Sequence, residues 1–159
     1  MNFIEGEILH INKPLHWTSF RVVNVFRAKL CRKLNIKKLK VGHAGTLDPL
    51  ATGVVTICTG KKTKLIEELQ KHTKEYVADI RLGATTASFD LETEVDAEYP
   101  ISHITKELVE SVLKRFIGSI EQIPPIFSAV KVDGKRAYEY ARKNEDIELK
   151  PKKLVIDSI

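Results

Sequence analysis

The sequence predicts one domain that mixes helices and strands. Apolar and polar residues alternate in "GEILHINKP" (residues 6–14), which indicates a strand, and "GVVTICTG" (residues 53–60) is typical of a short buried strand between glycines. Residues 105–117 carry apolar positions at helical spacing. At 159 residues the chain is long enough for one domain with a core and too short for two full domains.

The first half of the chain supplies two further helices to this expectation. The first strand should end at Pro14, because proline removes a ladder donor. Thr18 and Ser19 are suitable N-caps for a helix that runs to about Leu34. The residues expected near one face of this helix are Phe20, Val23, Phe26 or Arg27, and Leu30. A short helix is predicted over residues 63–70.

The second half alternates between strand and helix signals. "KEYVADIRLG" (residues 74–83) has a period of two and predicts a strand. Asp133-Gly134 is a turn signal, with a strand expected before it and a helical stretch after it. "KKLVIDSI" (residues 152–159) resembles the opening of another strand. Since a strand is usually completed by a following neighbour, we expect the chain to be part of a longer polypeptide.

The charge distribution points to a polyanionic partner. The net charge is +5 and the isoelectric point is near 9.1. Residues 27–40 contain seven cations and no acid, and residues 60–64 contain three lysines. A solvated helix face would explain either run alone. Because the two runs flank Asp48 in the sequence, together they favour an approach to Asp48 that is lined for phosphates.

Several classes of protein are not expected. No apolar run approaches the roughly 18 residues of a membrane span. Glu5 and Glu7 come early, with no basic segment ahead of an apolar stretch, so we expect a cytoplasmic protein without a secretory signal. Cys31 and Cys58 lie 27 positions apart with no clustered ligands around them, which predicts two reduced thiols rather than a metal site or disulfide.

The stretch "VGHAGTLDPLATG" (residues 41–53) presents one carboxylate, Asp48, in a loop. Pro49 biases Asp48 towards an extended conformation, and Thr46 or Thr52 could hydrogen-bond within the loop. A carboxylate that accepts such bonds stays ionised, which suits a nucleophile or base. The alternative is an Asp-Pro turn whose carboxylate caps a backbone amide. The glycines that give this loop its freedom are Gly42, Gly45 and Gly53.

Other site chemistries have little support around Asp48. A glycoside hydrolase needs a second carboxylate to act with the first, and the motif has none. His43 and Asp48 alone make no recognisable set of metal ligands.

Four segments, in order, resemble the TruB family of bacterial tRNA pseudouridine-55 synthases. "GHAGTLDPLATGVV" resembles the catalytic motif of the family, and "NKPLHWTSFRVV" resembles its Lys-Pro-x-Gly-x-Thr-Ser segment. "KEYVADIRLGATTASFD" resembles the segment with its tyrosine and Arg-Leu-Gly, and "QIPPIFSAVKVDGKRAYEYAR" resembles its thumb-like insertion, here about residues 123–152. The resemblance extends along essentially all 159 residues.

This resemblance implies a fold and a reaction. The fold is the α+β pseudouridine synthase fold, a largely antiparallel mixed sheet with flanking helices, and residues 1–159 would be the N-terminal part of the catalytic domain, whose C-terminal part is absent. In the reaction a uridine at position 55 of the tRNA T loop is flipped out and its N1–C1′ bond is broken. The uracil then turns and its C5 is joined to C1′. The family needs no cofactor or metal.

The resemblance also assigns roles to residues. Asp48 is the catalytic aspartate, acting on the base at C6 or on the ribose. Tyr76 stacks on the target base, with an ordinary core-facing strand aromatic as the alternative. His43 helps to hold flipped bases out of the stack, with a polar surface residue as the alternative. Arg81, Asp90 and Lys13 brace the site or contact RNA, with a structural salt bridge as the alternative for Arg81 and Asp90.

The chain departs from the family pattern in two ways. His16 stands where the family has glycine, which puts the packing of that segment behind Asp48 in question. An arginine that pairs with the catalytic aspartate belongs to a family segment beyond Ile159. We therefore expect no turnover from these 159 residues alone.

The expected partner is the T stem-loop of tRNA, bound by a monomer that needs neither a membrane nor a protein partner. Two alternatives stay open at this point. The first is a truncated tRNA-binding or tRNA-folding module without turnover. The second is an RNA-guided synthase that needs partner proteins, against which the thumb-like segment argues.

Overall fold

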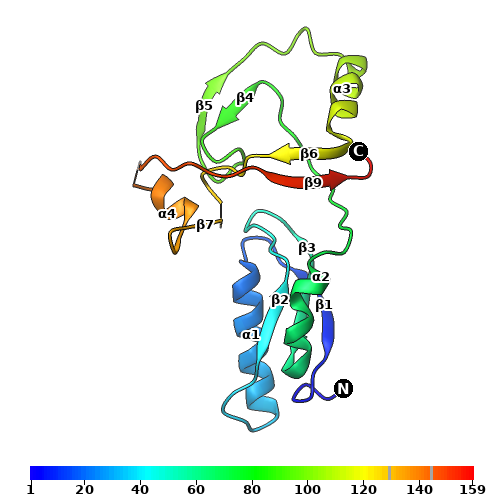
Figure 1. Ribbon diagram of the computed structural model, residues 1–159, viewed down its shortest axis with the longest axis vertical. Helices are drawn as coiled ribbons and strands as arrows, with labels where there is room; N and C mark the ends of the chain where they lie inside the picture. The colour runs from blue at the N-terminus through cyan, green and yellow to red at the C-terminus, as the bar shows by residue number, and fades with distance from the viewer. Residues whose placement is uncertain (129, 144) are drawn as a thin grey trace. The chain divides into compact units, whose positions relative to one another are not determined.

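The computed structural model describes residues 1–128, 130–143 and 145–159 (Figure 1). Residues 129 and 144, within the predicted thumb-like segment, lie outside the described residues. The chain divides into two compact units, Met1–Ala78 and Asp79–Ile159, and each is described by itself.

The first unit is built on a three-stranded antiparallel sheet. The strands are β1 (Ile8–Lys13), β2 (Val41–Ala44) and β3 (Gly53–Thr59), in the order β1-β3-β2. The predicted strands β1 and β3 are confirmed, whereas the short β2 was not expected. β3 is the central strand, so the positions of both its neighbours depend on it.

Helix α1 (Ser19–Lys33) covers one face of this sheet and confirms the predicted helix. The Thr18 side chain caps it by accepting a hydrogen bond from the Arg21 N–H at 3.0 Å. Val22 and Val23 pack against Val55 and Ile57 of β3 in the buried core. Phe20 was expected on one face of this helix with Val23 and Leu30, but it is 62% exposed, whereas Val23, Leu30 and its neighbour Ser19 are buried.

The opposite face of the sheet is covered by a short helical segment. The 3₁₀ helix η1 (Gly60–Leu65) leads into α2 (Ile66–Leu69), so the predicted helix over residues 63–70 is present with a 3₁₀ first part. A Cβ on Gly42 would lie 2.7 Å from Cδ1 of Ile66, so glycine lets α2 approach the sheet. Both cysteines are free, and burial raises the pKa of the Cys58 thiol.

The strand predicted over residues 74–83 is wrong. The described structure assigns no strand there, and the side chain of Val77 is 95% exposed. Alternation gives a segment one apolar face, but a strand also needs a neighbour that supplies ladder hydrogen bonds. None of the described strands pairs with this segment.

The described residues of the second unit form three two-stranded antiparallel sheets, two α-helices and one 3₁₀ helix. Helix α3 (Lys106–Leu113) confirms the helix predicted there, with Thr105 as its N-cap, and ends in the 3₁₀ helix η2 (Lys114–Phe116). The pairs are β4 (Ala84–Thr86) with β5 (Val95–Glu98), β6 (Gly118–Gln122) with β9 (Lys152–Ile156), and β7 (Lys131–Val132) with β8 (Lys135–Arg136).

Two sequence signals in this unit are confirmed. Asp133 and Gly134 both have positive φ, 48° and 83°, as a tight hairpin turn between β7 and β8 requires. The helical stretch expected after the turn is α4 (Ala137–Ala141). The strand at the end of the chain, β9, forms with β6 as its partner, so its neighbour precedes it in the sequence.

No described helix is both long and apolar enough to cross a membrane.

His16 is held in a backbone conformation that favours glycine. Its φ is 62°, the left-handed region, where a side chain costs about 1–3 kcal/mol. We predict that His16→Gly raises the free energy of unfolding by about 1 kcal/mol, because the relief of strain exceeds glycine's extra unfolded-state entropy. Denaturant unfolding measures the change, with His16→Ala, which keeps a Cβ at the same φ, as the control. A less stable His16→Gly protein would mean that the imidazole makes contacts worth more than the strain.

Candidate active site

Asp48 lies exposed in the loop of residues 45–52, which joins β2 to β3. Gly45 and Gly53 stand at the two ends of this loop with φ of 105° and 125°. Only glycine adopts such angles readily, so the chain turns out of one strand and into the next at these residues. The glycines therefore allow the loop to leave the sheet, but they do not by themselves fix the orientation of Asp48.

The first residue of α1 and the turn before it hold both chain neighbours of Asp48. The Ser19 hydroxyl donates to the Leu47 carbonyl at 3.1 Å and accepts from the Leu47 N–H at 2.9 Å. The His16 N–H donates to the Pro49 carbonyl at 2.7 Å. Asp48 is thus held on both sides through peptide groups, and its side chain remains free.

The expected hydrogen bonds within the loop are not those observed. In the described part of the chain, neither the Thr46 nor the Thr52 side chain bonds to the loop, and the support comes from residues 16 and 19 instead. The Asp48 carbonyl accepts from the Ala51 N–H at 3.1 Å, which closes the Asp-Pro turn. Among the described residues no amide donates to the Asp48 carboxylate, so the alternative of a capping aspartate has no support.

Lys13 stabilises the turn that contains His16. Its side chain is fully buried, and Nζ donates to the carbonyls of Pro14 at 3.1 Å and Trp17 at 2.6 Å. The Trp17 N–H also donates to the Pro14 carbonyl at 3.3 Å, so the ammonium stabilises the turn from which His16 reaches Pro49. A buried ammonium is not available to RNA, so of the two roles expected for Lys13 the geometry favours bracing.

His43 lies at the other entrance to the loop. It belongs to β2, pairs with Ile57 of β3, and is half-buried. Its Nδ1 is 2.6 Å from the Gly45 carbonyl. Because a carbonyl oxygen only accepts, Nδ1 carries the hydrogen in this contact.

Three further predicted residues lie outside this loop. The Tyr76 ring is 66% exposed in a stretch without secondary structure, which does not fit a core-facing strand aromatic. Arg81 and Asp90 belong to the second unit. Arg81 forms an exposed ion pair with Glu98, with Nη2 and Oε1 3.3 Å apart. The Asp90 carboxylate accepts from the Ser88 hydroxyl at 2.6 Å and the Glu92 N–H at 2.9 Å, which stabilises its own turn.

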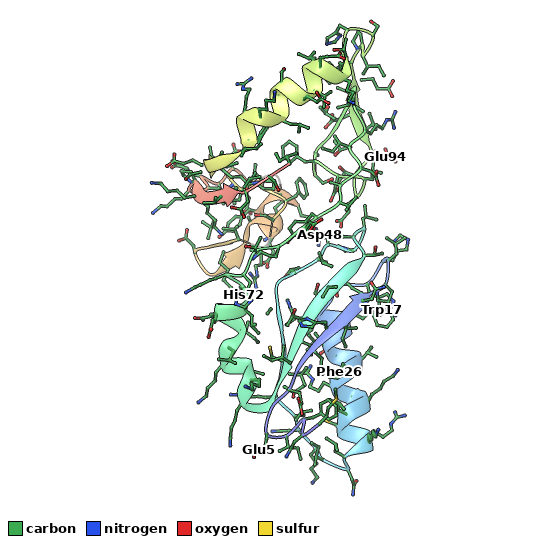
Figure 2. All side chains as sticks on the ribbon, turned by 90° about the vertical axis from the view of Figure 1, so that its right-hand side faces the viewer. Glu5, Trp17, Phe26, Asp48, His72 and Glu94 are labelled. Atoms are coloured by element: carbon green, nitrogen blue, oxygen red, sulfur yellow. The ribbon has the colours of Figure 1, made fainter. Side chains whose placement is uncertain are left out.

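Residues 38–40 and 60–64 of the two basic runs lie at the end of the sheet opposite Asp48. Val41 pairs with Thr59, and the Gly60 N–H donates to the Lys40 carbonyl at 3.0 Å, so Lys40 and η1 lie where β3 ends. β3 begins at Gly53 beside the Asp48 loop, and at about 3.3 Å per residue it separates the two ends by about 20 Å. Figure 2 shows Asp48 and Glu5 at opposite ends of the first unit. Lys40 and η1 therefore do not lie beside Asp48, and the expectation of an approach to Asp48 that is lined for phosphates stays a prediction.

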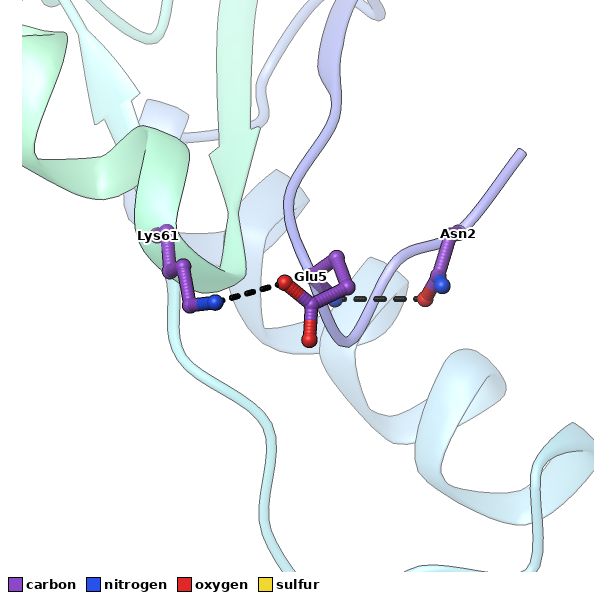
Figure 3. A network of polar contacts seen from close by, with 3 residues as sticks. All are labelled: Asn2, Glu5 and Lys61. Carbon is purple, nitrogen blue, oxygen red and sulfur yellow. Dashed lines mark hydrogen bonds and ion pairs between the residues drawn. The ribbon is translucent and has the colours of Figure 1, made fainter.

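We call this surface the basic end: Lys38, Lys40, Lys61 and Lys64, which line a cavity of about 300 Å³ together with Ile4, Leu39, Gly60 and Thr63. Within it, Lys61 is paired with Glu5, with Nζ and Oε2 2.6 Å apart, and the Glu5 N–H donates to Asn2 Oδ1 at 3.2 Å (Figure 3). The hydrogen bond from the Lys61 ammonium to the Glu5 carboxylate raises the pKa of Lys61. The basic end can bind an anion. The charge of Lys61 is partly neutralised by its ion pair with Glu5, so Lys61 contributes less to such binding than the other lysines.

Ser19 is a residue that the sequence did not single out for the site. The sequence signal marked it only as one of two possible N-caps, a role that Thr18 fills. Its contact with Leu47 spans 28 positions, a separation that no local pattern reports. Among the described residues, no group of three or more His, Cys, Asp or Glu side chains could hold a metal ion.

Comparison with known proteins identifies relatives over the whole chain. The tRNA pseudouridine synthase B of Phocaeicola vulgatus is 71% identical over 159 residues, which are all of this chain and 68% of that protein. The protein of the same name from Flavobacterium johnsoniae is 53% identical over 155 residues, covering 97% of this chain and 68% of the relative. That from Fusobacterium nucleatum is 44% identical over 158 residues, covering 98% of this chain and 52% of the relative.

A family model and a solved structure also match. A chain in the crystal structure of a Cbf5-Nop10-Gar1 complex aligns with a TM-score of 0.48 and 26% identity, over 81% of this chain and 32% of that one. The family model described as TruB family pseudouridylate synthase (N terminal domain) matches residues 32–159, which include the Asp48 loop and run through both units. From this match and the identities above, we conclude that the chain belongs to the TruB family of pseudouridylate synthases.

Proposed function

We propose that this chain carries the catalytic aspartate of an enzyme that converts uridine 55 in the T loop of tRNA to pseudouridine, with Asp48 as that residue. One observation carries the proposal. In a chain of a pseudouridylate synthase family, Asp48 is an exposed carboxylate in a loop that is held at both neighbouring residues.

The isomerisation of uridine to pseudouridine can use an exposed carboxylate as its nucleophile. In the isomerisation the N1–C1′ bond of the uridine breaks, a C5–C1′ bond forms, and the C5 proton is lost while N1 gains one, so no atoms are added overall. A carboxylate can act as nucleophile at C6 of the base or at C1′ of the ribose. Neither route requires a cofactor.

Two other residues suit the handling of the base. A detached uracil has to be retained while it turns, and stacking on an aromatic ring allows rotation in the ring plane. The exposed ring of Tyr76 is available for such stacking. The His43 ring, fixed by its bond to the Gly45 carbonyl at the start of the loop, is suited to hold a base that has left its stack.

The basic end suits tRNA phosphates away from the reacting base. It lies about 20 Å from the Asp48 loop along β3, a span that an extended polyanion such as tRNA can cover. Contacts there would position the tRNA and add affinity without touching the uridine.

The first test is Asp48→Asn in a polypeptide of the relatives' length that begins with this chain. The substitution keeps the shape of the side chain and removes its charge, so we expect pseudouridine formation to fall by about three orders of magnitude or more. Affinity for tRNA should stay near that of the parent. Tritium release from 5-labelled uridine in tRNA reports the reaction.

Glu67→Gln is the matched control for this test, because it removes another exposed carboxylate from α2 of the same unit. Its activity should stay near that of the parent. Activity of Asp48→Asn within tenfold of the parent would exclude Asp48 as the catalytic residue.

The second test is the triple substitution of Lys38, Lys40 and Lys64 by Gln. These are the lysines of the basic end without a described acid partner, so tRNA binding should weaken. The slope of log affinity against log salt should fall by about one for each phosphate that the variant no longer neutralises. Filter binding at several salt concentrations measures both quantities.

The control for the basic end carries the same loss of charge on the second unit: Lys106, Lys114 and Arg115, each changed to Gln on α3 and η2. It should change the slope less. Equal slopes for the two triple variants would mean that the basic end is an ordinary solvated surface.

A further inference from the structure

We propose that Ser19 and the peptide of His16 form a two-point clamp that fixes the direction of the Asp48 side chain, with Ser19 as a positioning residue for the reaction. The clamp consists of hydrogen bonds between described residues. Its effect on catalysis rests on the proposed function of Asp48. We name the clamp by its contacts: Ser19 to Leu47, and His16 to Pro49.

The Ser19 contact is buried and uses both functions of the hydroxyl. Ser19 is 1% exposed, and its oxygen both donates to the Leu47 carbonyl and accepts from the Leu47 N–H. A pair of bonds to the same peptide residue fixes the orientation of the backbone there and not only its distance. Water has little access to this contact, so it does not compete for either bond.

The His16 contact adds the second point at a cost in backbone strain. His16 donates to the Pro49 carbonyl from a backbone with a φ of 62°. Strained residues persist where the surroundings hold them, and here the buried Lys13 ammonium binds the carbonyls of Pro14 and Trp17 on both sides of His16. The turn is thereby held in the shape that presents the His16 N–H to the loop.

The loop needs such a clamp because of its own composition. Its ends at Gly45 and Gly53 can rotate widely, and at both positions the space where a Cβ would stand has no atom nearer than 3.8 Å. Leu47 packs partly against the core while Asp48 is exposed, so consecutive side chains point in and out. Fixing the backbone of residues 47 and 49 therefore restricts the backbone of Asp48 between them and sets the direction of its Cα–Cβ bond.

Hydrogen exchange of backbone amides tests the clamp without any assay of activity. In the unaltered 159-residue chain the Leu47 amide should exchange at least about tenfold more slowly than those of Thr46 and Asp48, for which no acceptor lies among the described residues. Ser19→Ala should remove this protection and leave that of the β3 amides unchanged. Ser19→Cys keeps the approximate size of the side chain with a weak hydrogen-bonding group and should behave in the same way.

Thr18→Ala is the matched control, since it removes a neighbouring hydroxyl whose described hydrogen bond caps α1. In a polypeptide of the relatives' length, Ser19→Ala should lower kcat about tenfold to a hundredfold with KM for tRNA unchanged, because a misplaced catalytic group costs rate and not binding. Thr18→Ala should keep kcat within about threefold of the parent.

Each result decides the proposal. Equal Leu47 protection in Ser19→Ala and the parent, or equal reductions of kcat in Ser19→Ala and Thr18→Ala, would overturn it. Reduced protection with an unchanged kcat would leave a structural role only and would also overturn the positioning role. If Asp48→Asn retained activity, the proposed function would fail while the exchange of Leu47 still reported on the clamp.

Discussion

The pairing of β3 with two neighbours decides where every important residue of the first unit lies. β3 has β1 on one side and β2 on the other, and the side chain of Ile57 at its centre is fully buried against α1. Its start at Gly53 meets Lys13 of β1, which brings the turn before α1 next to the Asp48 loop. Its end at Thr59 meets Val41, which gathers the lysines of the basic end. A one-residue slip of this register would turn Ile57 away from α1 and move both sites.

Local patterns predicted the elements that depend on local causes. β1, β3, α1 and α3 follow from periodicity and caps, and the Asp133-Gly134 turn follows from residues that accept positive φ. The segment of residues 74–83 has the alternation of a strand but no described ladder partner, and a pattern in one segment cannot report the presence of a partner elsewhere. For the same reason β2, a four-residue strand with a glycine, gave no signal of its own.

The candidate site was predictable in its residues but not in the contacts that hold its loop. Asp48 was evident from the glycines and proline around it, yet the groups that hold it come from a segment 28 positions earlier. The nearness in sequence of the basic runs to Asp48 did not predict where their lysines lie in space. Antiparallel strands reverse the chain, so residues 38–40 and 60–64, which flank the loop in sequence, meet at the far end of the sheet.

Support through peptide groups leaves the Asp48 carboxylate free for chemistry. A hydrogen bond to a carboxylate oxygen would fix that oxygen but would also occupy a lone pair and lower its nucleophilicity. The contacts to Leu47 and Pro49 restrict the backbone on both sides and bond to neither oxygen. The entropy of ordering the loop backbone around Asp48 is then largely lost on folding and not when RNA binds. A loop with a glycine at each end and a clamp in its middle thus leaves the carboxylate exposed while its backbone is held in one orientation. On a regular strand or helix the neighbouring side chains would cover one side of the carboxylate.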